Sequence, residues 1–211
     1  MKDVAVVGVG QSKFGKRTDA SFRESAFEAA RKAFEDVNLS KKEIDFPVVS
    51  TAMTESFNGQ AAPASIIVDY LGLMPKGSIR VEDACASGSA AVRTGYSLIK
   101  SGLAETVLVV GVEKMNEVGT TKAIESMARA SDVQWEYQPY GITFAGFYAM
   151  MAQAHTSEFG PTEEDLARVA VKNHEYGAMN EFAHVQKRIS IDDVLKSRVI
   201  GLFCVKTEFL F

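Results

Sequence analysis

Cys85 is the residue of this 211-residue chain whose type and position best suit covalent chemistry. It stands between a strand-like run that ends at Val81 and a helix-like run that begins near Ser87, among small neighbours. At such a junction, the unpaired N–H groups of the helix N-terminus favour a thiolate and can hold an oxyanion. The pattern predicts a nucleophile for acyl transfer. The alternative is an inert buried cysteine, since free cysteine is among the most buried residue types.

The remaining candidate motifs predict no further chemistry. Gly8 and Gly10 follow a strand-like run, but the next glycine, Gly15, lies too far along for a dinucleotide-binding fingerprint. Close packing of the chain explains these glycines better. The three histidines have no metal-ligand spacing, so we expect no metal site.

Composition limits the class of protein. The chain is 46% hydrophobic and 24% charged, which excludes disordered and low-complexity classes. Its net charge of −4 gives no overall attraction for nucleic acid. No apolar stretch is long enough to span a membrane, and Met1 leads into a strand-like run rather than a signal peptide. Two cysteines do not make a disulfide framework. We therefore expect a cytoplasmic globular protein with no nucleic-acid or membrane partner.

Strands and helices alternate along the first half of the chain, which is typical of a largely parallel α/β sheet. A capping box, Ser21 with Glu24, predicts the first helix. The apolar runs Val4–Val9, Phe46–Ser50 and Thr106–Val112 are expected to be neighbouring strands of one sheet. The helix Ser87–Ser101 should pack on that sheet, because its small residues allow a close approach.

The second half of the chain has a different character. Residues 113–142 lose the strand–helix rhythm and are predicted to form a long excursion with a helix over Ala123–Ala130. Helical spacing returns over Thr143–Phe159. Thr162 and Ser190 then cap two further predicted helices.

The segment Arg80–Val92 resembles the nucleophile segment of thiolases. The resemblance is greatest to the acetyl-CoA acetyltransferases of archaea and bacteria that are related to sterol-carrier thiolases. Other collinear stretches agree with the same family: Val4–Gly10, Phe57–Gln60, Asp69–Leu73, Val110–Met115, Tyr140–Phe144 and Val171–Glu175. Together the matches cover about residues 1–200 and correspond to the N-terminal half of a thiolase.

The resemblance implies one half of a thiolase-like fold. That half is a mostly parallel, mixed five-stranded sheet between helices, and the helix after Cys85 would be one of the buried central helices. Residues 1–200 would form the thiolase N-terminal domain, with residues 113–160 as a loop region over the active site. Residues 201–211 do not resemble the family and are assigned to a divergent tail.

The resemblance also implies a reaction. Cys85 would take an acyl group from a coenzyme A thioester, and the enolate of a second acyl-CoA would attack it in a Claisen condensation, or CoA in the reverse thiolysis. Ser87 and Gly88 would lie against the substrate. Acyl-CoA is then the substrate, and no permanently bound cofactor is expected.

One departure from the family bears on activity. Members are about twice as long, and their second half carries a Gly-His-Pro motif that this sequence lacks. We therefore expect the chain to be incomplete as an enzyme on its own, and to form a homodimer or associate with a complementing thiolase C-terminal chain. The alternative is a catalytically inactive, truncated thiolase-like protein that acts as a binding or assembly partner.

Overall fold

A computed structural model describes residues 3–201 and 205–206 of the chain. The chain forms two compact units. Unit 1 comprises Met1–Ser12 and Lys16–Ser126, and unit 2 comprises Lys13–Gly15 and Met127–Phe211. Cys85 belongs to unit 1, so that unit positions the candidate site.

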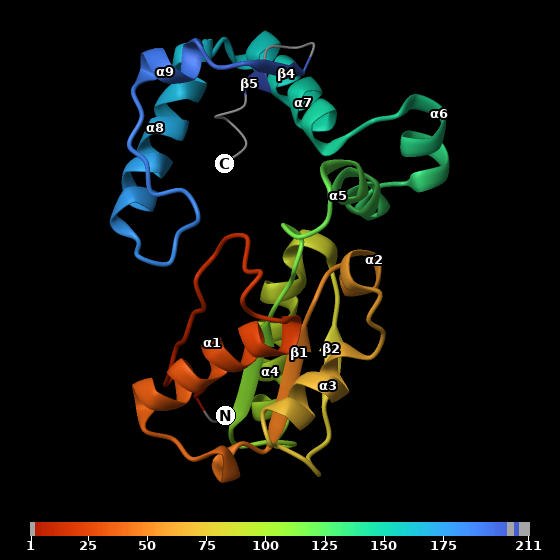
Figure 1. Ribbon diagram of the computed structural model, residues 1–211, viewed down its shortest axis with the longest axis vertical. Coiled ribbons are helices and arrows are strands. Elements are labelled where there is room, and N and C mark those ends of the chain that lie inside the picture. Colours follow the sequence, from red (N-terminus) through yellow and green to blue (C-terminus); the bar gives the residue numbers. More distant parts are fainter. Residues whose placement is uncertain (1–2, 202–204, 207–211) are drawn as a thin grey trace. The chain divides into compact units, whose positions relative to one another are not determined.

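Unit 1 is an α/β unit in which helices and strands alternate (Figure 1). Its elements are α1 (Phe22–Val37), β1 (Phe46–Ser50), α2 (Thr54–Asn58), α3 (Pro63–Tyr70), β2 (Ile79–Val81), α4 (Ser87–Lys100), β3 (Val107–Gly111) and α5 (Thr120–Met127), the last ending at the boundary with unit 2. Short 3₁₀ turns cover Lys41–Glu43 and Ala84–Ala86. The expected capping box is present, because Ser21 and Glu24 bond each other's backbone N–H groups.

The sheet of unit 1 is parallel, with strand order β2-β1-β3. Val48 in the central strand is opposite Ile79 on one side and Val109 on the other. Pro47 is compatible with this central position because the pairing with β2 begins only at Val48, so β2 does not require the missing N–H of the proline. The α/β class and the parallel sheet predicted from the sequence are confirmed.

Helices cover both faces of this sheet (Figure 1). On one face, α1 and α3 pack against Val49, Leu108 and Val110, and Ile67 at the centre of this cluster is fully buried. On the other face lies α4, where the Cβ position of Gly95 is 3.1 Å from Val109 Cγ2. Small residues thus let α4 approach the sheet closely, as the sequence predicts.

The prediction of a strand at Val4–Val9 is wrong. These residues form no strand, and the sheet of unit 1 has three strands over the described residues rather than the expected five. The segment lies instead along α1, where Gly8 and Gly10 contact the helix backbone and Val9 N–H donates to Asp36 Oδ2 at 2.9 Å. A strand requires a partner for its hydrogen bonds, and an apolar sequence cannot supply that partner by itself.

The expectation that the helix after Cys85 is fully buried is also wrong. Only one face of α4 is covered, through Ser87, Ala91 and Gly95. Val92 and Tyr96, on another face of the helix, are 56% and 51% exposed. A single sheet can bury only one stripe of a helix, so the remaining apolar residues of α4 stay in solvent.

Unit 2 consists mainly of helices. These are α6 (Gln138–Tyr140), α7 (Phe144–Phe159), α8 (Glu163–Met179) and α9 (Ile191–Leu195), with 3₁₀ and π turns at Ala128–Ala130 and Val133–Tyr137 and a hairpin of β4 (Val199–Gly201) and β5 (Val205–Lys206). Thr162 and Ser190 cap α8 and α9 as the sequence predicts. The predicted divergent tail, 201–211, lies largely outside the described residues.

Over its described residues, the chain has no helix that is both long and apolar enough to cross a membrane.

Asp45, just before β1, accepts hydrogen bonds from two residues just before β3. Its contribution to the free energy of unfolding should therefore depend on pH. The N–H groups of Thr106 and Glu105 donate to its carboxylate at 2.9 and 2.8 Å and hold its pKa below the ordinary value of 3.8. A lowered pKa means that the stabilisation is complete above the ordinary value and is lost as the pH falls through the folded-state pKa.

We therefore expect Asp45→Asn to be less stable than the wild type at neutral pH, and this difference to shrink below about pH 3.8. Urea unfolding of both proteins at several acidic pH values measures the difference in their free energies of unfolding. A stability difference that grows on acidification would contradict this assignment.

Candidate functional site

Cys85 lies at the carboxyl edge of the sheet of unit 1. It is in the 3₁₀ turn Ala84–Ala86, which follows β2 and leads directly into α4. The carboxyl ends of parallel strands are the usual place for ligands in open α/β sheets. The structure thus confirms the predicted position of Cys85 between a strand and the N-terminus of a helix.

The turn that carries Cys85 is held by a local network of hydrogen bonds. Ser87 Oγ accepts from Asp83 N–H at 2.8 Å and donates to Ala84 C=O at 2.6 Å. Ala86 N–H donates to Asp83 C=O at 2.8 Å. Ala84 has φ +43°, a left-handed conformation that is unfavourable for a residue with a side chain and persists only where its surroundings fix it. The network therefore holds the backbone around Cys85 in a strained conformation.

The thiol is accessible to a reagent. Cys85 is an exposed free cysteine, so the alternative expectation that it is buried is wrong. Gly88, one helical turn along, has no atom within 4 Å of its Cβ position, and it is exposed. Ser87, in contrast, is buried and its hydroxyl is engaged within the turn. The surface at Gly88, three residues after Cys85, is therefore open.

Two further contacts fix the loops at this edge of the sheet. Glu113, just after β3, accepts hydrogen bonds from the N–H groups of Ala52 and Met53 at 2.9 and 2.8 Å and from Thr54 Oγ1 at 3.2 Å. Arg80 of β2 forms an ion pair with Glu55 of α2, and this contact lowers the pKa of Glu55. Sequence reasoning missed both contacts because they join residues distant in the chain.

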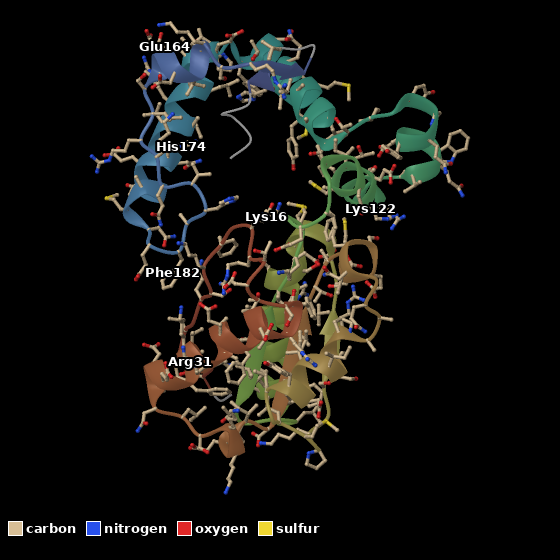
Figure 2. The ribbon with its side chains drawn as sticks, viewed as in Figure 1. Lys16, Arg31, Lys122, Glu164, His174 and Phe182 are labelled. Atoms are coloured by element: carbon tan, nitrogen blue, oxygen red, sulfur yellow. The ribbon has the colours of Figure 1, made fainter. Side chains whose placement is uncertain are left out.

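No histidine occurs in unit 1, which contains Cys85. His155, His174 and His184 all belong to unit 2. His174 is buried on α8, where its Nδ1 lies 3.0 Å from Lys187 C=O (Figure 2). Unit 1 therefore supplies a thiol without an imidazole base of its own.

Among the described residues, no cluster of three or more histidine, cysteine, aspartate or glutamate side chains is arranged to hold a metal ion. The groups at the carboxyl edge of the sheet are the thiol of Cys85, the N-terminus of α4 and backbone N–H groups. These groups suit attack on a polarised carbonyl carbon.

Known proteins resemble this chain over most of its length. Residues 4–194 match the thiolase N-terminal domain family. The chain is 41% identical over 201 residues to an acetyl-CoA acetyltransferase of Methanothermobacter thermautotrophicus, and 42% identical over 201 residues to one of Methanocaldococcus jannaschii. It covers 52% and 50% of those two proteins, with 95% of its own length. The chain thus spans about half the length of the curated relatives it matches.

Solved structures give the same result. The Ltp2-ChsH2(DUF35) aldolase superposes with a TM-score of 0.76 at 25% sequence identity, covering 97% of this chain and 51% of the aldolase chain. This chain therefore covers about half of the aldolase chain as well. The extent of the family match and the level of identity to full-length relatives lead to one conclusion: the chain belongs to the thiolase family and carries its N-terminal domain.

Proposed function

We propose that Cys85 is an acyl-accepting nucleophile for coenzyme A thioesters. The observation that carries this proposal is the exposed thiol in the strained turn between β2 and α4. Ser87 fixes the turn, and the open space at Gly88 admits the acyl group. The names of the two archaeal relatives, acetyl-CoA acetyltransferases, support an acetyl thioester as the substrate class.

The proposed step is a transthioesterification. Cys85 Sγ attacks the carbonyl carbon of acetyl-CoA, and the bond from that carbon to the CoA sulfur breaks. The thiol proton of Cys85 ends on the departing CoA, so free CoA and an acetylated Cys85 are the products. Backbone N–H groups at the N-terminus of α4 would stabilise the intermediate oxyanion. No oxidant, metal or permanently bound cofactor is required by this balance.

Intact-protein and peptide mass spectrometry after incubation with acetyl-CoA tests the proposal. We expect one acetyl group on the peptide that contains Cys85, and its removal by neutral hydroxylamine, which cleaves thioesters but leaves acetyl-lysine. Cys85→Ser should lose the hydroxylamine-sensitive label, while Cys204→Ser should keep it. Acetylation confined to lysines, or equal labelling of Cys85→Ser, would overturn the assignment.

A second candidate function is assembly with a complementing polypeptide. The chain spans about half of its relatives, and unit 1 has no histidine to act as the base for a carbon–carbon bond-forming step. In this case Cys85 would become acetylated without turnover of acetoacetyl-CoA. Turnover by the chain alone, faster than by Cys85→Ala, would favour a complete enzyme instead.

A further inference from the structure

Ala84, the residue before Cys85, is held at both of its polar backbone groups. Its N–H donates to Glu82 Oε1 at 2.5 Å, and its C=O accepts from Ser87 Oγ at 2.6 Å. Glu82 is the residue after β2, and Ser87 is the first residue of α4. One hydrogen bond lies on each side of the Ala84 Cα atom, so together the two bonds restrict both of its backbone torsions.

The two hydrogen bonds oppose the conformational preference of alanine. Ala84 has φ +43°, and in this left-handed region the Cβ atom lies too close to the following carbonyl oxygen. Asparagine and aspartate tolerate the region through their own short polar side chains, which alanine lacks. The left-handed turn therefore depends on its bonding partners, and the loss of either hydrogen bond should release it.

The two bonding partners differ in how they are built into the fold. Ser87 is buried and belongs to the covered face of α4. Glu82 is exposed, so truncation of its side chain opens no cavity in the core. Glu82 can therefore be changed while the packing of unit 1 is kept, and the effect on the turn can be measured by itself.

The conformation of Ala84 sets the direction in which the chain enters Cys85, because the two residues share a peptide plane. Acyl transfer requires the thiol, the acyl carbon and the oxyanion-binding N–H groups to be aligned, and a misplacement of about 1 Å can cost about 100-fold in rate. Alkylation by a small reagent requires only an accessible thiol, and Cys85 is exposed. The two reactions therefore separate the orientation of Cys85 from its accessibility.

We infer that Glu82 is a positioning residue for acyl transfer to Cys85. Its carboxylate holds the N–H of Ala84, keeps the turn left-handed and thereby aims the thiol at the carbonyl carbon of the thioester. In this role Glu82 neither contacts the substrate nor transfers a proton. The inference rests on the proposed function of Cys85 as the acyl acceptor, and its experiments distinguish the failure of one from the failure of the other.

Hydrogen exchange at the amide of Ala84, followed by NMR, tests the hold of Glu82 without any substrate. In Glu82→Ala the amide should exchange about tenfold faster than in the wild type, the change expected for the loss of a hydrogen bond to a charged group. Glu82→Gln should keep most of the protection, because the side-chain oxygen of glutamine also accepts a hydrogen bond.

Two reactions of Cys85 test the consequence for acyl transfer. Glu82→Ala should lower the rate of hydroxylamine-sensitive acetylation by acetyl-CoA at least about tenfold, and should leave alkylation by iodoacetamide close to the wild-type rate. Glu82→Gln should restore acetylation, which separates the hydrogen bond from the charge. Glu125→Ala, which removes an exposed carboxylate of α5 in the same unit, should react like the wild type in both assays. Circular dichroism checks that each variant is folded.

A double-mutant cycle with Ala84→Gly tests whether Glu82 acts through the strained backbone. Glycine adopts a positive φ without the steric cost that a Cβ atom brings, so Gly at this position depends less on the hydrogen bond from Glu82. In the Ala84→Gly background, Glu82→Ala should therefore lower the acetylation rate much less than it does in the wild-type background. The difference between the two effects measures the coupling of Glu82 to Ala84.

Three results would overturn the positioning role while acetylation of the wild type stands. These are an unchanged exchange rate of the Ala84 amide in Glu82→Ala, equal loss of acetylation in Glu82→Ala and Glu82→Gln, and an undiminished effect of Glu82→Ala in the Ala84→Gly background. A wild type that takes up no acetyl group would instead overturn the function proposed for Cys85, and the positioning role with it.

Discussion

Ile67→Ala is expected to lower the free energy of unfolding by about 2–5 kcal/mol, the usual cost of removing a large aliphatic side chain from a packed core. Ile67 on α3 has no exposed surface and lies in the cluster between α1, α3 and the sheet. Its removal leaves a cavity against Val49 and Val68, which cannot relax because neighbouring strands and helices hold them. Urea unfolding followed by circular dichroism measures the loss.

Ile66→Ala is the matched control for this prediction. Ile66 precedes Ile67 in the same helix but is only half-buried, so the two substitutions change helix propensity equally. The loss for Ile66→Ala should be clearly smaller. Equal losses would show that α3 does not pack on the sheet through Ile67.

Gly10→Ala is expected to displace the N-terminal segment from α1, with a loss of about 1–3 kcal/mol in the free energy of unfolding. A Cβ at Gly10 would lie 2.1 Å from Ala29 C=O oxygen and 2.4 Å from Ala33 N. Both contacts are to helix backbone, which cannot rotate away as a side chain does. Val9 N–H, which donates to Asp36, should therefore lose its protection from hydrogen exchange.

Gly119→Ala is the control, because nothing lies within 4 Å of its Cβ position. Its unfolding free energy should match that of the wild type within about 0.5 kcal/mol. Normal exchange protection of Val9 in Gly10→Ala would show that the segment does not rest on α1.

Local features of the structure were predictable from the sequence. Each capping box, such as Ser21 with Glu24 or Thr162 with Asp165, involves residues three apart and so depends on no distant contact. The strand β1 was predicted from its apolar, β-branched run, although the same pattern at Val4–Val9 formed no strand. The location of Cys85 between β2 and α4 followed from the order of these elements.

Contacts across the chain were not predictable in this way. Glu113 bonds to the backbone after β1, about sixty positions earlier, and nothing in either local sequence indicates the pairing. The strained φ of Ala84 is likewise fixed by the hydroxyl of Ser87 and not by a preference of alanine. The resemblance to thiolases identified the nucleophile segment, but the exposure of its thiol came from the structure.

The segment Val4–Val9 separates what the sequence determined from what the tertiary structure decided. Its valines favour an extended backbone and are unfavourable in water, so the sequence determined an extended segment that tends to be buried. Whether it became a strand depended on a partner edge, and the described part of the chain places none against it. Backbone hydrogen bonds between strands are satisfied only by a second chain segment at the correct distance. Residues 4–10 have no such neighbour in the described part of the chain, and their apolar sequence alone could not provide one.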